Sequence, residues 1–123
     1  MLLKDKIAII TGAASRRGLG RAMAQLFAQH GARVAILDLD LEQAREAVAS
    51  LKGRGHLAGK CDVTRRSDCD KAVARVLKRY GRVDVLVNNA GITSPLRLMM
   101  ADDASYNRVM DVNMRGTYHM TQA

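Results

Sequence analysis

A glycine-bearing stretch between an apolar run and an amphipathic segment has the residue types and spacing of a phosphate-binding turn. Residues Thr11–Gly20 read TGAASRRGLG, with glycine at Gly12, Gly18 and Gly20 and a hydroxyl at Ser15. Glycines let the main chain turn sharply and approach a pyrophosphate, and the helix that follows offers free N–H groups and a positive dipole end. In this context the stretch predicts dinucleotide binding, although glycines alone would suit any tight connection.

Two aspartates stand where an adenosine could be recognised. Asp38 ends an apolar run, and a carboxylate there can accept both ribose hydroxyls and repel a 2′-phosphate; an exposed strand-end aspartate is the alternative. Asp62, followed by Val63, could accept from the adenine amino group, but a helix-capping or loop aspartate would look the same. Arg16 and Arg17 favour the other cofactor, because a guanidinium can clamp a 2′-phosphate or stack on adenine. We predict NAD, with NADP as the alternative.

Carboxamides occur at two further places where an unpaired amide would be costly. Asn88 and Asn89 follow an apolar run, and Ala90 and Gly91 then remove side-chain bulk where a nucleotide sugar would lie. Asn113 falls on an apolar helix face. Buried amides need hydrogen-bond partners, so each of these asparagines has a structural alternative: tying neighbouring strands together, or satisfying nearby backbone groups.

The elements that would position these residues alternate regularly along the chain. Apolar runs predict strands at residues 7–10, 34–37, roughly 56–63 and 83–88. Amphipathic segments predict helices from Leu19 to the Gly31 break, from an Asp40 cap to Gly53, from a Ser67 cap to Tyr80 with Gly81 as the stop, and from Asp102 or Asp103 onward, after a loop at Ser94-Pro95. This order predicts a doubly wound, Rossmann-like α/β fold with a parallel sheet and four βα units, whose ligands bind at the carboxyl ends of the strands.

Composition narrows the class of protein. The chain has 123 residues, 48% hydrophobic and 26% charged, which fits one globular domain or less. No apolar run approaches the ~20 residues of a membrane span, and no signal peptide precedes the first strand, so we expect a cytoplasmic protein. The net charge of +8 comes with only 3% aromatic residues, too few for base stacking, so we expect no nucleic-acid partner.

The histidines and cysteines do not form the patterns of a metal site or a disulfide framework. Cys61 and Cys69 have no neighbouring Cys or His at metal-ligand spacing, and His30, His56 and His119 are scattered singly. We therefore expect reduced thiols and no metal.

Taken together, the motifs resemble the short-chain dehydrogenase/reductase family over the whole chain. The resemblance rests on Thr11–Gly20, Asp62-Val63, Asn88-Asn89-Ala90-Gly91 and Asp111-Val112-Asn113, in this order. It implies an NAD or NADP cofactor and hydride transfer to or from a small-molecule alcohol or carbonyl. It also implies roles for single residues: Gly12, Gly18, Leu19 and Gly20 at the pyrophosphate, with Ser15 and Arg17 beside them; Asp38 at the ribose; Asp62 and Val63 at adenine; Asn89, Ala90 and Gly91 at the second ribose; and Asn113 as the catalytic asparagine.

Two departures from the family pattern affect these expectations. Five residues, rather than the usual three, separate Gly12 from Gly18, which weakens the cofactor preference. The family's Tyr-x-x-x-Lys pair and upstream Ser are absent, since Tyr80, Tyr106 and Tyr118 are followed four places later by Asp84, Met110 and Gln122. We expect residues 1–123 to be a truncated dinucleotide-binding domain, incomplete at the C-terminus, with little or no dehydrogenase activity alone. A non-catalytic NAD(P)-binding module and an inactive remnant are the alternatives.

The last predicted helix has apolar residues on two faces. Val109, Val112, Gly116 and Met120 mark the inward face, and Met110, Met114 and Tyr118 form an outer stripe. An apolar outer stripe predicts a homo-oligomer through this helix, unless the stripe covers further chain of the same protein. The apolar loop Thr93–Met100 favours a mostly apolar substrate.

Overall fold

The computed structural model describes all residues from Met1 to Ala123. Four parallel strands form one sheet in the order β3-β2-β1-β4. They are β1 (Ile7–Thr11), β2 (Arg33–Asp38), β3 (Leu57–Lys60) and β4 (Val85–Val87). A helix follows each strand along the chain, and the strand order reverses direction between β1 and β4. The doubly wound α/β prediction is confirmed, and the switch point lies where a ligand crevice is expected.

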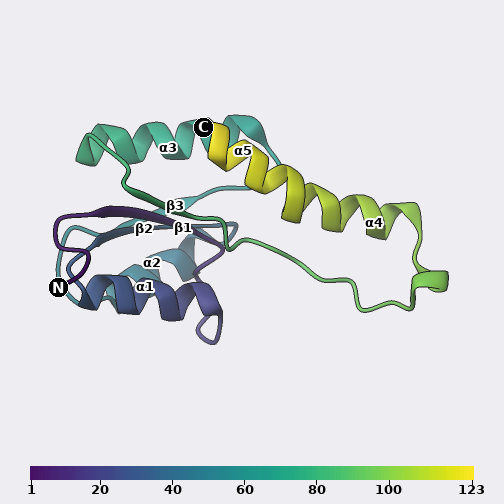
Figure 1. The fold of residues 1–123 in the computed structure, drawn as a ribbon, viewed down its shortest axis with the longest axis horizontal. Coiled ribbons are helices and arrows are strands. Elements are labelled where there is room, and N and C mark those ends of the chain that lie inside the picture. Colours follow the sequence, from purple (N-terminus) through teal and green to yellow (C-terminus); the bar gives the residue numbers. More distant parts are fainter.

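Helices cover both faces of the sheet (Figure 1). On one face lie α1 (Leu19–Gln29) and α2 (Leu41–Ala49), and on the other α3 (Arg66–Tyr80) and α5 (Gly116–Gln122). Successive strand residues point to opposite faces, so Ile10 and Ile36 pack with α1 and α2, while Ile9 and Leu37 pack with α3. Each helix is either too short or too polar to traverse a lipid bilayer.

The outer two strands are shorter than the sequence indicates. β4 ends at Val87 because the chain turns there: Asn89 N donates to the Val87 carbonyl over 3.0 Å. β3 ends at Lys60, although Cys61 N still donates to the Asp38 carbonyl over 2.9 Å. β4 also begins two residues later than predicted, at Val85, so it loses residues at both ends, whereas β3 loses most of its predicted residues at the carboxyl end.

The helix termini differ from the predicted residues at two places: α2 ends at Ala49, before the predicted Gly53 break, and α3 begins at a different cap. Asp40 caps α2, since its Oδ1 accepts from Gln43 N over 3.1 Å. The predicted Ser67 cap is wrong, because the cap position belongs to Arg65, whose carbonyl accepts from Cys69 N over 3.2 Å. Gly81 ends α3 with a φ of 78°, the left-handed conformation that favours glycine.

The last helical segment is not one regular helix. It begins with α4 (Asp103–Met110), capped by Asp102 after the short turn η1 (Leu98–Met100), and projects beyond the sheet (Figure 1). A π-helical turn, η2 (Asp111–Arg115), joins α4 to α5. Beyond this turn Gly116 and Met120 are buried, as predicted for the inward face, and a Cβ on Gly116 would meet Val63 Cγ2 at 2.6 Å.

Candidate dinucleotide site

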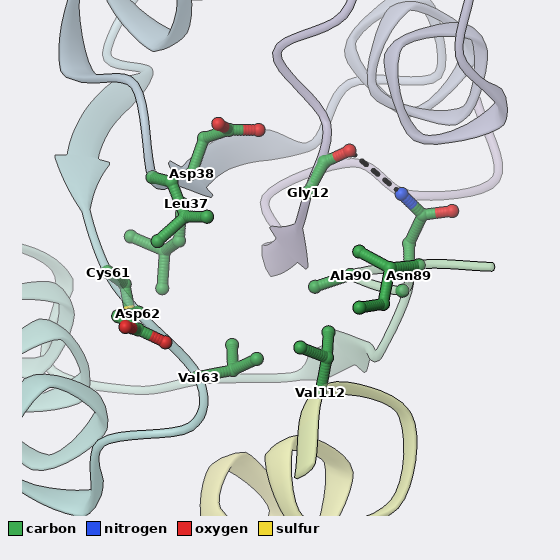
Figure 2. Close-up of a pocket in the computed structure, with 12 residues that line it drawn as sticks. Gly12, Leu37, Asp38, Cys61, Asp62, Val63, Asn89, Ala90 and Val112 are labelled. Carbon is green, nitrogen blue, oxygen red and sulfur yellow. Dashed lines mark hydrogen bonds between the residues drawn. The ribbon is translucent and has the colours of Figure 1, made fainter. Parts of the chain in front are cut away.

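A pocket of about 290 Å³ opens at the carboxyl ends of the strands (Figure 2). It lies beside the switch point between β1 and β4. Seven of its lining residues are among the predicted site residues: Gly12, Asp38, Asp62, Val63, Asn89, Ala90 and Gly91. The other predicted residues do not line this pocket: Ser15, Arg17, Gly18, Leu19 and Gly20 lie on the turn and the start of α1, and Asn113 lies in η2. The fold thus brings the ends of β1, β2, β3 and β4 together around one opening.

The glycines of the turn have different reasons for being glycine. Gly12 has a φ of 66°, and a Cβ there would lie 2.7 Å from Ala90 Cα. A Cβ on Gly20 would lie 2.9 Å from Ala13 Cα and would collide with the Asn89 amide. Gly18, by contrast, has a φ of −81° and would place its Cβ no closer than 3.5 Å to any atom. Packing therefore requires the first and third glycines, while the second leaves the helix N-terminus open to a ligand.

One buried hydroxyl joins the turn to the end of β4. Thr11 Oγ1 accepts from Asn89 N at 3.2 Å and from Ala90 N at 3.0 Å, and it donates to the Val87 carbonyl at 3.5 Å. Asn89 Nδ2 completes the connection by donating to the Gly12 carbonyl over 3.0 Å (Figure 2). Thr11 was not among the predicted site residues; the available signal was a hydroxyl at the end of an otherwise apolar strand.

The Asp38 carboxylate lies at the rim of the pocket and organises the backbone around it. Its Oδ2 accepts from Ala14 N over 3.3 Å, and its Oδ1 accepts from Asp40 N over 3.0 Å. These bonds connect the end of β2 to the turn after β1. The carboxylate keeps acceptor capacity toward the pocket that it lines, because each oxygen has two lone pairs.

Asp62 has the loop role that its sequence context left open, and it also lines the pocket. Its Oδ1 accepts from Thr64 N at 3.0 Å and from Thr64 Oγ1 at 2.6 Å. Its main-chain N–H donates to Asp68 Oδ2 over 3.1 Å. The Oδ2 of Asp62 accepts no hydrogen bond within the chain, so one oxygen stays available beside Val63.

The two neighbouring asparagines after β4 contact different parts of the fold. Asn89 joins β4 to the turn after β1, whereas Asn88 Nδ2 donates to Thr121 Oγ1 of α5 over 3.3 Å. The structural role considered for Asn88, linking neighbouring strands, is thus performed by Asn89 instead.

Asn113 is committed to the backbone after β4. Its Oδ1 accepts from Ile92 N and its Nδ2 donates to the Ile92 carbonyl, both over 2.9 Å. The main-chain carbonyl of Asn113 accepts from Thr117 Oγ1 over 3.0 Å. The side chain therefore fixes the segment beside Gly91, where a Cβ would come within 3.3 Å of Asn113 Oδ1.

A buried cation beneath the turn makes the site electropositive. Arg21 is only 6% exposed; its Nη1 donates to the Ala14 carbonyl over 3.0 Å and its Nη2 to Ser50 Oγ over 3.1 Å. Its Nε has no partner, and no carboxylate pairs with the guanidinium. The first turn of α1 holds no acidic residue either. Because an uncompensated buried charge is costly, this helix terminus favours an anion.

The exposed residues of the turn have few contacts of their own. The main-chain carbonyl of Ser15 accepts a hydrogen bond from Gly18 N over 3.2 Å, and the Ser15 hydroxyl makes no hydrogen bond. Leu19 is 80% exposed at the start of α1, and Arg17 is exposed without an ionic partner. Arg16 instead pairs with Glu46 of α2, with 2.7 Å between Nε and Oε1.

The pocket also contains a thiol that stays protonated. Burial raises the pKa of Cys61 to about 12, and the neighbouring thiol of Cys69 adds to the effect. Burial raises the pKa of Cys69 as well. Both are free cysteines, and only Cys61 lines the pocket, where at neutral pH it contributes an uncharged thiol. No group of three or more His, Cys, Asp or Glu side chains is arranged to hold a metal ion.

Comparison with known proteins agrees with this fold. The model of the short chain dehydrogenase family matches residues 6–123. The chain belongs to this family. It is 46% identical to an uncharacterized short-chain type dehydrogenase/reductase of Sinorhizobium fredii, with 99% of this chain and 49% of the relative covered. It is 42% identical to a sorbitol dehydrogenase of Cereibacter sphaeroides, with 100% and 47% covered.

A solved structure shows the same fold with a cofactor. The crystal structure of a 3-ketoacyl-(acyl-carrier-protein) reductase from Brucella melitensis complexed with NADH superposes with a TM-score of 0.91 at 40% sequence identity. The match covers 98% of this chain and 49% of that one. This short-chain dehydrogenase chain therefore spans about half the length of the relatives it matches.

Proposed function

We propose that the pocket binds NAD(H), with the pyrophosphate at the N-terminus of α1. The proposal rests on two features of the same turn. Packing does not require Gly18 to be a glycine, and the buried Arg21 beneath the turn has no carboxylate partner. Main-chain N–H groups of the turn and of Leu19 would donate to the phosphate oxygens, with Ser15 and Arg17 beside them. Gly12 and Gly20 would hold the turn close to Ala90 and Asn89, in the conformation that leaves this path open.

The remaining pocket residues would hold the two nucleosides. Asp38 would accept the adenosine ribose hydroxyls, which favours NAD over NADP. Asp62 and Val63 would lie at adenine. Asn89, Ala90 and Gly91 would border the second ribose, on the side of the pocket nearest η2.

We propose that the whole protein transfers a hydride between the cofactor and a small-molecule alcohol or carbonyl. When bound, the nicotinamide supplies the hydride, and the protein must supply position and a proton. Within these residues Asn113 is a positioning residue, since its amide fixes Ile92 beside the pocket. Residues 1–123 contain no Tyr-x-x-x-Lys pair to donate the proton.

The substrate class stays broad. Two relatives are named for sorbitol and for a 3-ketoacyl group on a carrier protein, which share only an alcohol or carbonyl carbon. In this chain, Leu98 and Met99 are 86% and 91% exposed on the segment after the pocket, which favours a substrate with an apolar part.

A titration of the chain with NADH tests the binding proposal. We expect saturable binding, and we expect Gly18→Ala to weaken it by roughly tenfold or more, about 1.4 kcal/mol, because a methyl group would occupy the phosphate path. Thermal unfolding of Gly18→Ala should stay close to wild type, since its Cβ meets nothing closer than 3.5 Å. The proposal would be overturned if the chain did not bind NADH at millimolar concentration, or if Gly18→Ala bound NADH with the same affinity as wild type.

The same chain tests the assignment of the proton donor. We expect NADH to bind without turnover when residues 1–123 are mixed with common ketones, because no group in the chain is placed to protonate the developing alkoxide. The measurement is loss of NADH absorbance over hours. Turnover above the protein-free rate would show that the chain carries its own donor.

A further inference from the structure

The two arginines of the turn after β1 are used differently. Arg16 donates through Nε to Oε1 of Glu46 over 2.7 Å, and its Nη2 makes a second contact with the same oxygen. The pair bridges residues 30 positions apart and connects the turn to α2. Arg17, next along the turn, has no such partner. The turn thus carries one guanidinium that is held and one that is free.

The Arg16–Glu46 pair lies close to the place where the two cofactors differ. NAD and NADP differ only at the 2′ position of the adenosine ribose, and Asp38 would bind that ribose. Asp38 Oδ2 accepts from Ala14 N over 3.3 Å. The turn therefore contacts the end of β2 at Ala14, which is two residues before Arg16 in the sequence. A guanidinium released from Glu46 would therefore be near a 2′-phosphate.

The pair is not what holds the turn against α2. Arg21 already makes that connection from beneath, with its Nη1 on the Ala14 carbonyl and its Nη2 on Ser50 Oγ. Arg21 is buried, whereas the side chains of Arg16 and Glu46 are 78% and 50% exposed. Breaking the exposed pair should leave the turn in place and change only where Arg16 points.

We propose that Glu46 is a specificity-determining residue: it binds Arg16 and so withholds from NADP the cation that would pair with its 2′-phosphate. The inference rests on the proposed function of the pocket. The preference for NAD(H) would then depend on two carboxylates, those of Asp38 at the ribose and of Glu46 on α2. Arg16 then affects the choice of cofactor only when Glu46 is neutralised.

The test compares NADH and NADPH titrations of the chain in wild type, Glu46→Gln, Arg16→Gln and the double variant. An exposed ion pair shifts an equilibrium by up to about fivefold, so the NADPH-to-NADH dissociation-constant ratio should fall about two- to fivefold in Glu46→Gln. Arg16→Gln alone should leave the ratio near wild type. The double variant should lose the gain of Glu46→Gln. Glu42→Gln is the charge-matched control, because Glu42 pairs with Arg45 on the same helix.

Each contrary result has a distinct meaning. A gain that persists in the double variant would show that Glu46 acts by direct repulsion, which overturns the role of Arg16. An equal gain in Glu42→Gln would reduce the effect to net charge and overturn the inference. No change in Glu46→Gln, with NADH still bound, would overturn it too. Failure of every variant to bind NADH would instead remove the proposed function.

Discussion

The hydroxyl of Thr11 shows how much of the pocket depends on a single buried atom. It accepts hydrogen bonds from two main-chain N–H groups of the segment after β4, and Thr11 is 1% exposed. Replacing it by the isosteric valine would keep the volume but leave both N–H groups without an acceptor. We expect Thr11→Val to cost about 1–3 kcal/mol of unfolding free energy and to weaken NADH binding.

Urea denaturation and NADH titration measure these two losses. Thr11→Ser is the matched control, because it removes a methyl group and keeps the hydroxyl. We expect it to retain most of the binding. Equal affinities in Thr11→Val and wild type would show that the pocket is held by other contacts.

At the residue scale, sequence predicts the members of the site better than their contacts. Gly12 and Asn89 were expected in the pocket because their types and places in the chain suit it, and both line it. Arg21 was not expected beneath the turn, because an arginine in a helix usually lies on the solvent-exposed face. The Asn113 contact with Ile92 was also invisible, since the partner is a main-chain group 21 positions away.

At the scale of elements, a salt-bridged carboxylate fastens β4 to β1. Asp84 Oδ2 accepts from Ile7 N over 2.8 Å and from Arg82 Nε over 2.9 Å. The Ile7 N–H bond, helped by Arg82, holds the pKa of Asp84 below its ordinary value of 3.8. The native state therefore prefers the ionised carboxylate, and the stabilisation it gives is present above about pH 4.

This stabilisation should be lost as the pH falls through the lowered native pKa of Asp84. We expect Asp84→Asn to unfold at lower urea at neutral pH and to show a flatter loss of stability between pH 5 and about pH 2. Urea midpoints measured across that range test it. Asp103→Asn is the control, because Asp103 is exposed and its side chain accepts no hydrogen bond. Parallel acid profiles for Asp84→Asn and wild type would contradict the prediction.

The order of elements was predictable because strand and helix periods differ and each apolar run is bounded by turn residues. Residues 7–10 and 34–37 fall inside β1 and β2. The η2 turn was not predictable, because Val112, Gly116 and Met120 follow one another at the four-residue spacing of an uninterrupted α-helix. The start of α3 was missed since Arg65 caps it through the main chain, without the side chain that marks a cap.

At the scale of the whole molecule, the outer stripe of the last helical segment offers a surface for assembly. Met114 and Tyr118 are 61% and 57% exposed, and Met110 is partly covered. We propose that this stripe pairs with a second copy of the chain. Met110→Lys with Met114→Lys should lower the assembled mass in sedimentation, because two cations would face an apolar contact.

Met99→Lys serves as the comparison for that double variant. Met99 is 91% exposed but lies on η1, outside the stripe, so its substitution should leave the mass unchanged. An unaltered mass in the double variant would show that the stripe serves another purpose, such as covering further chain of the same protein.

The π turn at Asp111–Arg115 limits how this chain could change over evolution. A π turn holds one residue more than the α turn it replaces, so a single deletion there would let α4 and α5 merge into an ordinary helix. Everything before the deletion would then rotate by about 100° relative to Gly116 and Met120. Asn113 could no longer reach Ile92, and no point substitution would restore it. We therefore expect a one-residue deletion at this turn to cost more stability than one in the exposed segment from Pro95 to Met100.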